Sequence, residues 1–175
     1  IQLHFIPGLV DDHGRKKHPG GGYSCHVCVL RPKSRGSVRL QSPDPLAPPL
    51  IDPNFLSDED DLRRLLKGAR IVERILDAPA FKPVDGEQMY VSRGAPDEEI
   101  IADIRARSDT IYHPVGTCRM GADAGAVVDP ACRVNKVTGL RVIDASIMPT
   151  LVGGNTNAPS IMIGERAADL IKGAA

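Results

Sequence analysis

A loop that begins with a histidine is the part of the sequence best suited to chemistry. Residues 113–121 read His-Pro-Val-Gly-Thr-Cys-Arg-Met-Gly, so a histidine opens a segment whose polar part lies between two glycines. Histidine has an ordinary pKa of about 6.5 and can accept a proton at neutral pH. Taken alone, His113 is better explained as a structural residue at a loop start. Its candidacy as a base therefore depends on its surroundings.

Two later segments supply polar groups that could act beside this histidine. Asp144 and Ala145 follow the apolar run 140–143, and strand ends that face helix starts are common ligand sites in open sheets. A polar turn precedes the last apolar helix; its residues are Asn155, Thr156, Asn157, Ala158 and Pro159. The free backbone N–H groups of a helix N-terminus favour an anion. Asn157 by itself is better explained as an ordinary N-cap or turn residue.

Two other pairs of residues resemble metal ligands, but neither is predicted to bind one. Cys25 and Cys28 form a C-x-x-C, yet alternation along a strand sends them to opposite faces, and no second C-x-x-C is present. His13 and His18 lie in a glycine-rich loop without a cluster of carboxylates or cysteines around them. We therefore expect no metal site and four free thiols.

Hydrophobic periodicity predicts an α+β chain. Helices are expected at 58–76, at 96–108 and from about 159 to 171, with Gly173 as the stop after the last one. Strands are expected at 1–10, 23–31, 37–41, 127–130, 132–134 and 140–143. The turn at 31–36 predicts that strands 23–31 and 37–41 form a hairpin, and the proline-rich segment 42–54 is expected to be an ordered loop or an extended crossing.

The composition is that of an ordinary globular chain and excludes several functions. Among the 175 residues, 42% are hydrophobic and 25% are charged, and the 22 basic side chains are balanced by 22 acidic ones. This balance, with only 3% aromatic residues and no tryptophan, argues against a nucleic-acid partner. The sequence contains no apolar run of about 18 residues, so no transmembrane segment is predicted.

The ordered set of C-terminal motifs resembles the C-terminal signature of glucose–methanol–choline (GMC) oxidoreductases. The motifs are the 113–121 loop, Val-Val-Asp-Pro at 127–130, Gly-Leu-Arg-Val-Ile-Asp-Ala-Ser-Ile-Met-Pro at 139–149, and Gly-Asn-Thr-Asn-Ala-Pro-Ser-Ile-Met-Ile-Gly-Glu at 154–165. Weaker similarity at 30–36 and 51–55 extends the resemblance over nearly the whole chain. The alcohol and choline dehydrogenase branch is the most similar.

The resemblance implies an FAD enzyme with a dinucleotide-binding domain and a substrate domain that is an antiparallel sheet with helices. The chain carries no G-x-G-x-x-G, so it is expected to correspond to the C-terminal third of such an enzyme, with the N-terminal FAD domain lying outside it. Residues 1–112 would belong to the substrate-binding domain. Residues 113–175 would carry the active-site loop and a strand and helix that complete the FAD domain.

The resemblance also implies roles for individual residues. His113 matches the catalytic histidine of the family, and Asn157 matches its second active-site position. Asp144 and Ala145 match the segment that touches the ribityl–phosphate part of the cofactor. In the family, a turn lies under the isoalloxazine ring of the cofactor. The residues of this chain that match that turn are Asn155, Thr156, Asn157, Ala158 and Pro159.

These roles predict the oxidation of a primary alcohol, choline-like or aliphatic, to the aldehyde by hydride transfer to flavin. His113 would take the hydroxyl proton, Asn157 would orient the alcohol oxygen, and the helix start would stabilise charge on the flavin. The isolated chain is expected to lack FAD and activity. The alternative function is a non-catalytic binding or dimerisation module with the same fold.

The apolar segment 140–171 is expected to be covered by the FAD domain in the longer enzyme. Without that cover, it is predicted to make the chain self-associate into a homo-oligomer or to be partly disordered. We expect a cytoplasmic location, with peripheral association with the inner membrane of the cell as the alternative.

Overall fold

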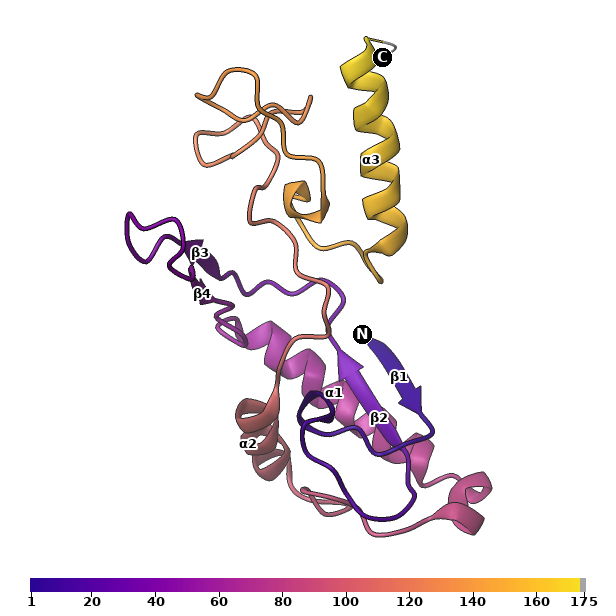
Figure 1. Cartoon of the computed structure of the whole chain (residues 1–175). Coiled ribbons are helices and arrows are strands. Elements are labelled where there is room, and N and C mark those ends of the chain that lie inside the picture. The colour runs from indigo at the N-terminus through magenta and orange to yellow at the C-terminus, as the bar shows by residue number, and fades with distance from the viewer. Residues whose placement is uncertain (174–175) are drawn as a thin grey trace. The chain divides into compact units, whose positions relative to one another are not determined.

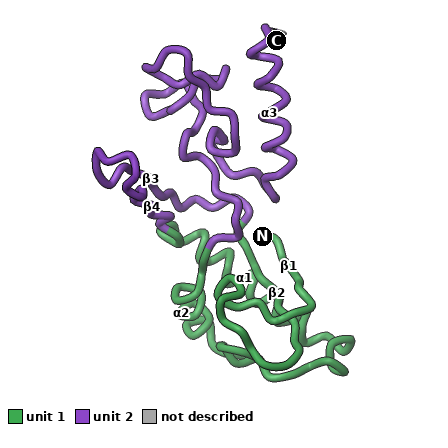
Figure 2. Tube along the Cα trace, in the orientation of Figure 1, with its two compact units in different colours: residues 1–29, 55–109 green, residues 30–54, 110–175 purple. Residues whose placement is uncertain are grey.

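The structure, a computed structural model, describes residues 1–173 (Figure 1). They form two compact units: unit 1 comprises residues 1–29 and 55–109, and unit 2 comprises residues 30–54 and the chain from 110 onward (Figure 2). Small antiparallel sheets combined with helices confirm the predicted α+β class. The predicted division at residue 112 concerns the domains of a longer enzyme and stays a prediction.

Unit 1 is a two-stranded sheet covered by a long helix. Strand β1 (Gln2–Ile6) pairs antiparallel with β2 (Ser24–Cys28), with Leu3 opposite Val27. Helix α1 (Glu59–Leu76) lies so close to the sheet that a Cβ on Gly68 would be 2.4 Å from Val27 Cγ1. A glycine at position 68 therefore sets how near the helix can approach β2.

The two helices of unit 1 confirm the prediction from periodicity. Acidic residues occupy the first turn of α1, and the N-cap Asp58 accepts a hydrogen bond of 2.8 Å from the amide of Asp60. Helix α2 (Asp97–Arg107) begins after Pro96 and buries Ile100. The short 3-10 helix η1 (Asp12–Gly14) lies in the segment that is expected to be a glycine-rich loop, and a second one, η2 (Pro79–Val84), follows α1.

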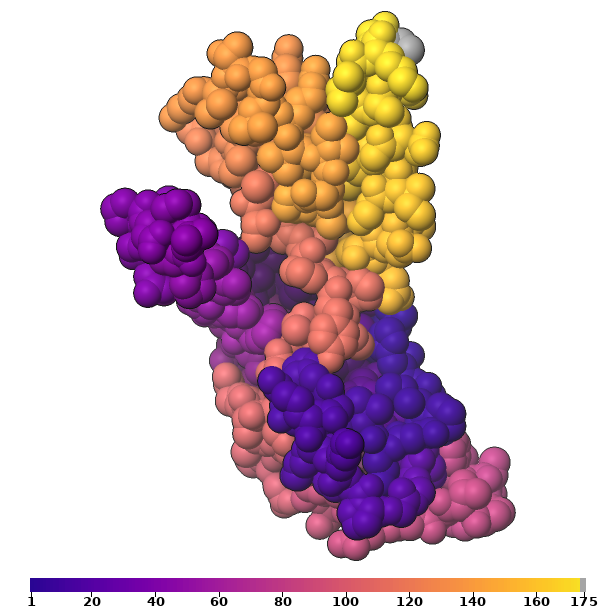
Figure 3. All heavy atoms as spheres, in the orientation of Figure 1, coloured from indigo at the N-terminus to yellow at the C-terminus, as the bar shows by residue number. Residues whose placement is uncertain are grey.

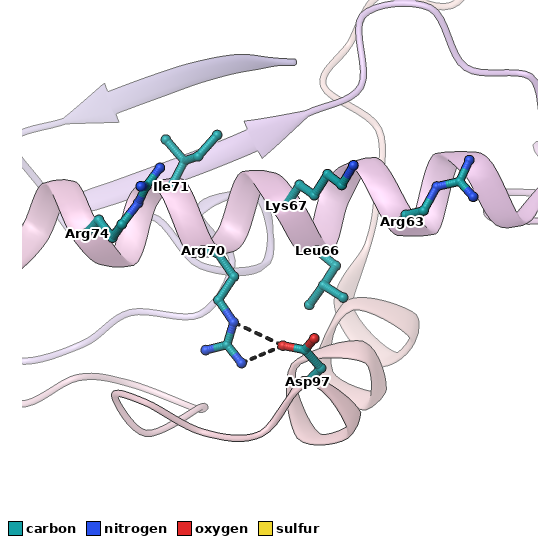
Figure 4. A pocket seen from close by; sticks show the side chains of 7 residues that line it. All are labelled: Arg63, Leu66, Lys67, Arg70, Ile71, Arg74 and Asp97. Carbon is teal, nitrogen blue, oxygen red and sulfur yellow. Dashed lines mark hydrogen bonds and ion pairs between the residues drawn. The ribbon is translucent and has the colours of Figure 1, made fainter.

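An ion-pair network joins α1 to the start of α2. Arg70 points away from the helix axis toward Asp97, while Lys67 and Arg74 extend elsewhere along a surface pocket (Figure 4). Arg70 also donates to Glu73, with Nη1 and Oε2 2.9 Å apart, and to the carbonyl of Ala95. Glu73 in turn accepts a hydrogen bond from the amide of Gly94, so a side chain of α1 anchors the loop that precedes α2.

We expect Glu73→Gln to weaken the folded state at neutral pH and to flatten its acid dependence. The Gly94 amide, followed by Arg70, lowers the pKa of Glu73. A lowered folded-state pKa contributes stability above the unfolded value of about 4.3, and this contribution is lost as the pH falls through the folded-state value. Urea unfolding of both proteins at neutral and acid pH measures the difference. The control is Glu87→Gln, which changes a residue in an exposed loop. Its unfolding free energy should depend on pH in the same way as that of the wild type.

Unit 2 contains the second sheet, and here the predicted hairpin is wrong. Strand β3 (Ser37–Arg39) pairs antiparallel with β4 (Leu50–Asp52), a strand within the segment expected to be an ordered loop or an extended crossing. The partner of β2 is β1, and the chain passes from unit 1 to unit 2 between residues 29 and 30, so the 31–36 turn lies within unit 2. A Cβ on Gly36 would lie 2.1 Å from the Asp52 carbonyl oxygen, so the second sheet requires glycine there.

The prediction of strands at 127–130, 132–134 and 140–143 is also wrong. They appear only as isolated bridges, Val128 with Val134 and Arg133 with Arg141, and Leu140 is 51% exposed. Turns interrupt the pairing, because the amide of Cys132 bonds back to the Asp129 carbonyl at 2.9 Å. This irregular chain nevertheless surrounds a core. The buried core residues are Val128, Cys132, Ile147, Met148, Ile163 and Ala167.

The last helix, α3 (Asn157–Lys172), has a partner within unit 2. Ile163 and Ala167 pack into the core, and Figure 3 shows the helix lying along the loops of residues 120–150. Gly173 ends the helix in the left-handed conformation at φ 73°, as predicted. Ile161 and Met162 remain 60% and 58% exposed, and the predicted self-association stays a prediction. Among the helices of residues 1–173, none is long and apolar enough to span a bilayer.

Candidate active site

His113 is the centre of a small polar cluster in unit 2. Its ring is half-buried, and Nδ1 lies 2.8 Å from Thr156 Oγ1. The other ring nitrogen, Nε2, lies 2.7 Å from Asn155 Nδ2. The structure thus brings together three of the residues predicted from the sequence, although 42 positions separate His113 from Asn155 along the chain.

The two side-chain contacts are compatible with a neutral tautomer in which Nε2 is the acceptor. The amide nitrogen of Asn155 donates, so Nε2 accepts in that contact. In this tautomer Nδ1 donates to the hydroxyl oxygen of Thr156. The backbone amide of Thr156 also donates toward Nδ1 from 3.4 Å, which is the longest of the three contacts and the one that the other tautomer would satisfy. An unprotonated Nε2 is the form that a general base requires. Thr156 is buried, whereas Asn155 is exposed.

The loop that follows His113 is tied to a short 3-10 helix, η3 (Ala145–Ile147). Its backbone amides at Cys118 and Met120 donate to the carbonyls of Ser146 and Ile147, at 3.0 Å and 2.8 Å. Gly116 makes the turn in the left-handed region at φ 87°, and a Cβ there would lie 3.3 Å from the Met148 carbonyl oxygen. Glycine at position 116 is therefore needed for both the conformation and the close approach.

Asp144 and Ala145, the predicted cofactor contacts, lie at the start of η3. One carboxylate oxygen of Asp144 caps this helix by accepting a 2.7 Å hydrogen bond from the amide of Ser146. The rest of the Asp144 side chain is exposed, and Ala145 packs against the core. The position of Asp144 is thus set by local capping, which leaves its outer oxygen available to a ligand.

The predicted turn at 155–159 forms the N-terminus of α3. Thr156 is the N-cap, and its carbonyl accepts from both the amide and the hydroxyl of Ser160, at 3.0 Å and 2.7 Å. Asn157 and Ala158 are exposed in the first turn, and Pro159 follows them. The first amides of a helix have no partner within it, so this end can bind an anion. Asn155 and Thr156 were predicted as cofactor contacts only; their contacts with His113 link residues too distant in sequence for local patterns to indicate.

The two cysteines of unit 1 are half-buried thiols. Burial raises the pKa of both Cys25 and Cys28, and Cys28 Sγ lies 3.7 Å from His4 Nε2. A raised pKa keeps a thiol protonated and unreactive at neutral pH. Within residues 1–173, no three His, Cys, Asp or Glu side chains are grouped so that they could hold a metal ion, and the four cysteines form no disulfide.

Comparison with known proteins gives a consistent set of relatives. A family model for the C-terminal part of GMC oxidoreductases matches residues 32–164. The chain is 52% identical to the alcohol dehydrogenase (acceptor) of Pseudomonas putida over 172 residues, which are 98% of this chain and 31% of that protein. It is 46% identical to the mitochondrial choline dehydrogenase of Homo sapiens, over 99% of this chain and 30% of that protein.

Solved structures agree with these relatives. An FAD-dependent oxidoreductase from Chaetomium thermophilum superposes with a TM-score of 0.78 at 31% identity, over 89% of this chain and 27% of that one. The chain therefore spans under a third of the length of each protein compared with it.

Proposed function

Because this chain belongs to the GMC oxidoreductase family, we propose that it carries the base-bearing part of the active site of an FAD-dependent alcohol dehydrogenase. The observation that carries this function is the ring of His113, held between the side chains of Asn155 and Thr156 at the N-terminus of α3. This contact supports a proton acceptor next to a helix end that can bind an anion.

His113 Nε2 is the atom that takes the hydroxyl proton of the substrate. An alcohol oxygen within hydrogen-bond distance of Nε2 takes the place of the Asn155 amide, whose exposed side chain rotates away. Thr156 Oγ1, 2.8 Å from Nδ1, accepts the Nδ1 hydrogen bond and so leaves Nε2 free to take the proton of the substrate. Asn157, exposed in the first turn of α3, donates to the alcohol oxygen and orients it. A base positioned in this way contributes about 10²–10⁴ in rate.

The residues present fit the redox-active end of FAD. When bound, FAD supplies the hydride acceptor for the carbon that bears the hydroxyl. The exposed first turn of α3, at Asn157 and Ala158, offers unpaired amides to the electron-rich edge of the ring system. The outer oxygen of Asp144 would be available to accept a hydrogen bond from the ribityl–phosphate part of the cofactor. The sequence has no G-x-G-x-x-G, so the pyrophosphate is assigned to a separate dinucleotide-binding domain.

The substrate class is a primary alcohol, either aliphatic or choline-like. The names of the relatives support both, since one is an alcohol dehydrogenase and the other a choline dehydrogenase. Recognition of a quaternary ammonium needs aromatic faces. With three Phe, three Tyr and no Trp, this chain supplies few of them, so the other domain would complete a choline site.

The rival function is a binding or dimerisation module that keeps this fold without flavin, and colour separates the two. We expect the protein that joins this chain to a dinucleotide-binding domain to purify yellow and to lose its flavin absorbance when a primary alcohol is added without oxygen. A colourless preparation that stays colourless after incubation with FAD would favour the module.

A further inference from the structure

The turn that holds His113 is itself packed against an arginine from a distant part of unit 2. Gly153 lies two residues before Asn155, in the connection between η3 and α3. A Cβ built on Gly153 would lie 2.8 Å from Arg31 Nη2, 3.1 Å from Cζ and 3.6 Å from Nε. Three atoms of one guanidinium plane therefore cover this glycine.

The neighbouring glycine shows that the contact is specific to one position. A Cβ on Gly154 would meet nothing within 4 Å. Neither glycine adopts the left-handed conformation, so alanine is tolerated by the backbone at both positions. Only the approach of Arg31 distinguishes them. At Gly153 an added methyl group would displace the guanidinium, which is the end of a flexible side chain, and leave the backbone in place.

The turn gains from such a contact, because its two glycines restrain the backbone weakly. Two consecutive glycines have more backbone freedom to lose than any other pair. The guanidinium of arginine is planar and pre-organised, so it can restrain a backbone segment at small entropic cost.

We propose that Arg31 is a positioning residue: it packs on Gly153 and fixes the 153–156 turn, so that Asn155 and Thr156 hold His113 in a single tautomer. Arg31 acts through the turn and touches neither substrate nor cofactor. The importance of this role for catalysis rests on the function proposed above. The positioning itself can be measured on the chain as it stands, without flavin.

The experiment is ¹⁵N NMR of the His113 ring in the 175-residue chain. In the wild-type chain we expect the Nδ1 and Nε2 signals to be far apart, because one is protonated and the other is not. In Arg31→Ala and in Gly153→Ala the two signals should move toward each other as the tautomers mix. Arg31→Lys should resemble Arg31→Ala, because an ammonium has no plane to cover the glycine.

Two matched controls should keep the wild-type signals: Gly154→Ala next to the contact, and Arg39→Ala at an exposed site on β3. The methyl signals of Val128 and Ile163 report whether the core is intact. If Arg31→Ala unfolds the core, the ring signals of Gly153→Ala test the proposal instead. Wild-type ring signals in a folded Arg31→Ala or in Gly153→Ala would overturn the role of Arg31. Averaged ring signals in the wild-type chain would also overturn the role of Arg31. The proposed function would not be affected by that result, because it is tested separately by the yellow colour of the flavin and its loss on reduction.

Discussion

Replacing His113 by alanine should lower kcat of the flavin-bearing enzyme by about 10²–10⁴-fold, the usual contribution of a general base. The ring is the only part removed, and its two hydrogen-bond partners, Asn155 and Thr156, remain in the turn before α3. Flavin content should stay near that of the wild type, since the groups assigned to the cofactor are backbone amides and Asp144. Steady-state turnover with a primary alcohol, together with the flavin absorbance per protein, measures both quantities.

A matched control for this variant is His13→Ala. His13 lies in unit 1, where its ring pairs with Asp109 at 2.7 Å. Its loss removes a histidine without touching the 113–121 loop, so turnover should be unchanged. If His113→Ala turns over at the wild-type rate, the base must be another group, and the ring serves only to hold the turn.

Ile163→Ala should destabilise unit 2 by about 2–5 kcal/mol, the range for removing most of a buried aliphatic side chain. Ile163 is 8% exposed and lies in the core with Val128 and Met148. Ile161→Ala, two positions earlier on the same helix but 60% exposed, should change the unfolding free energy by less than about 0.5 kcal/mol. Urea unfolding of the three proteins measures the difference. Equal effects of the two substitutions would mean that α3 is not docked through its Ile163 face.

The helices could be predicted from the sequence because their signals are local. Acidic residues at the start of α1, its periodic leucines and the glycine after α3 all act within a turn or two of their own position. The polar turn before α3 and the loop after His113 could be recognised for the same reason, as runs of residue types with a fixed spacing.

The strand pairings could not be predicted, because they depend on which segments meet. The strand 24–28 finds its partner in residues 2–6, and 37–39 pairs with a proline-flanked strand that has no alternating pattern. The apolar run 140–143 has the composition of a strand but makes only one bridge, since turns on both sides divide the chain. The contacts of Asn155 with His113 and of Arg31 with Gly153 also join distant segments.

Anaerobic single-turnover reduction of the flavin by a primary alcohol, followed across pH in the wild-type enzyme and in His113→Ala, tests the central claim most directly. If Nε2 accepts the hydroxyl proton, the wild-type rate should rise with pH, because a general base acts only in its unprotonated form. The His113→Ala enzyme should lack that rise and be reduced about 10²–10⁴-fold more slowly. Reduction of the His113→Ala enzyme at the wild-type rate, with the same rise, would contradict the assignment of His113 as the base.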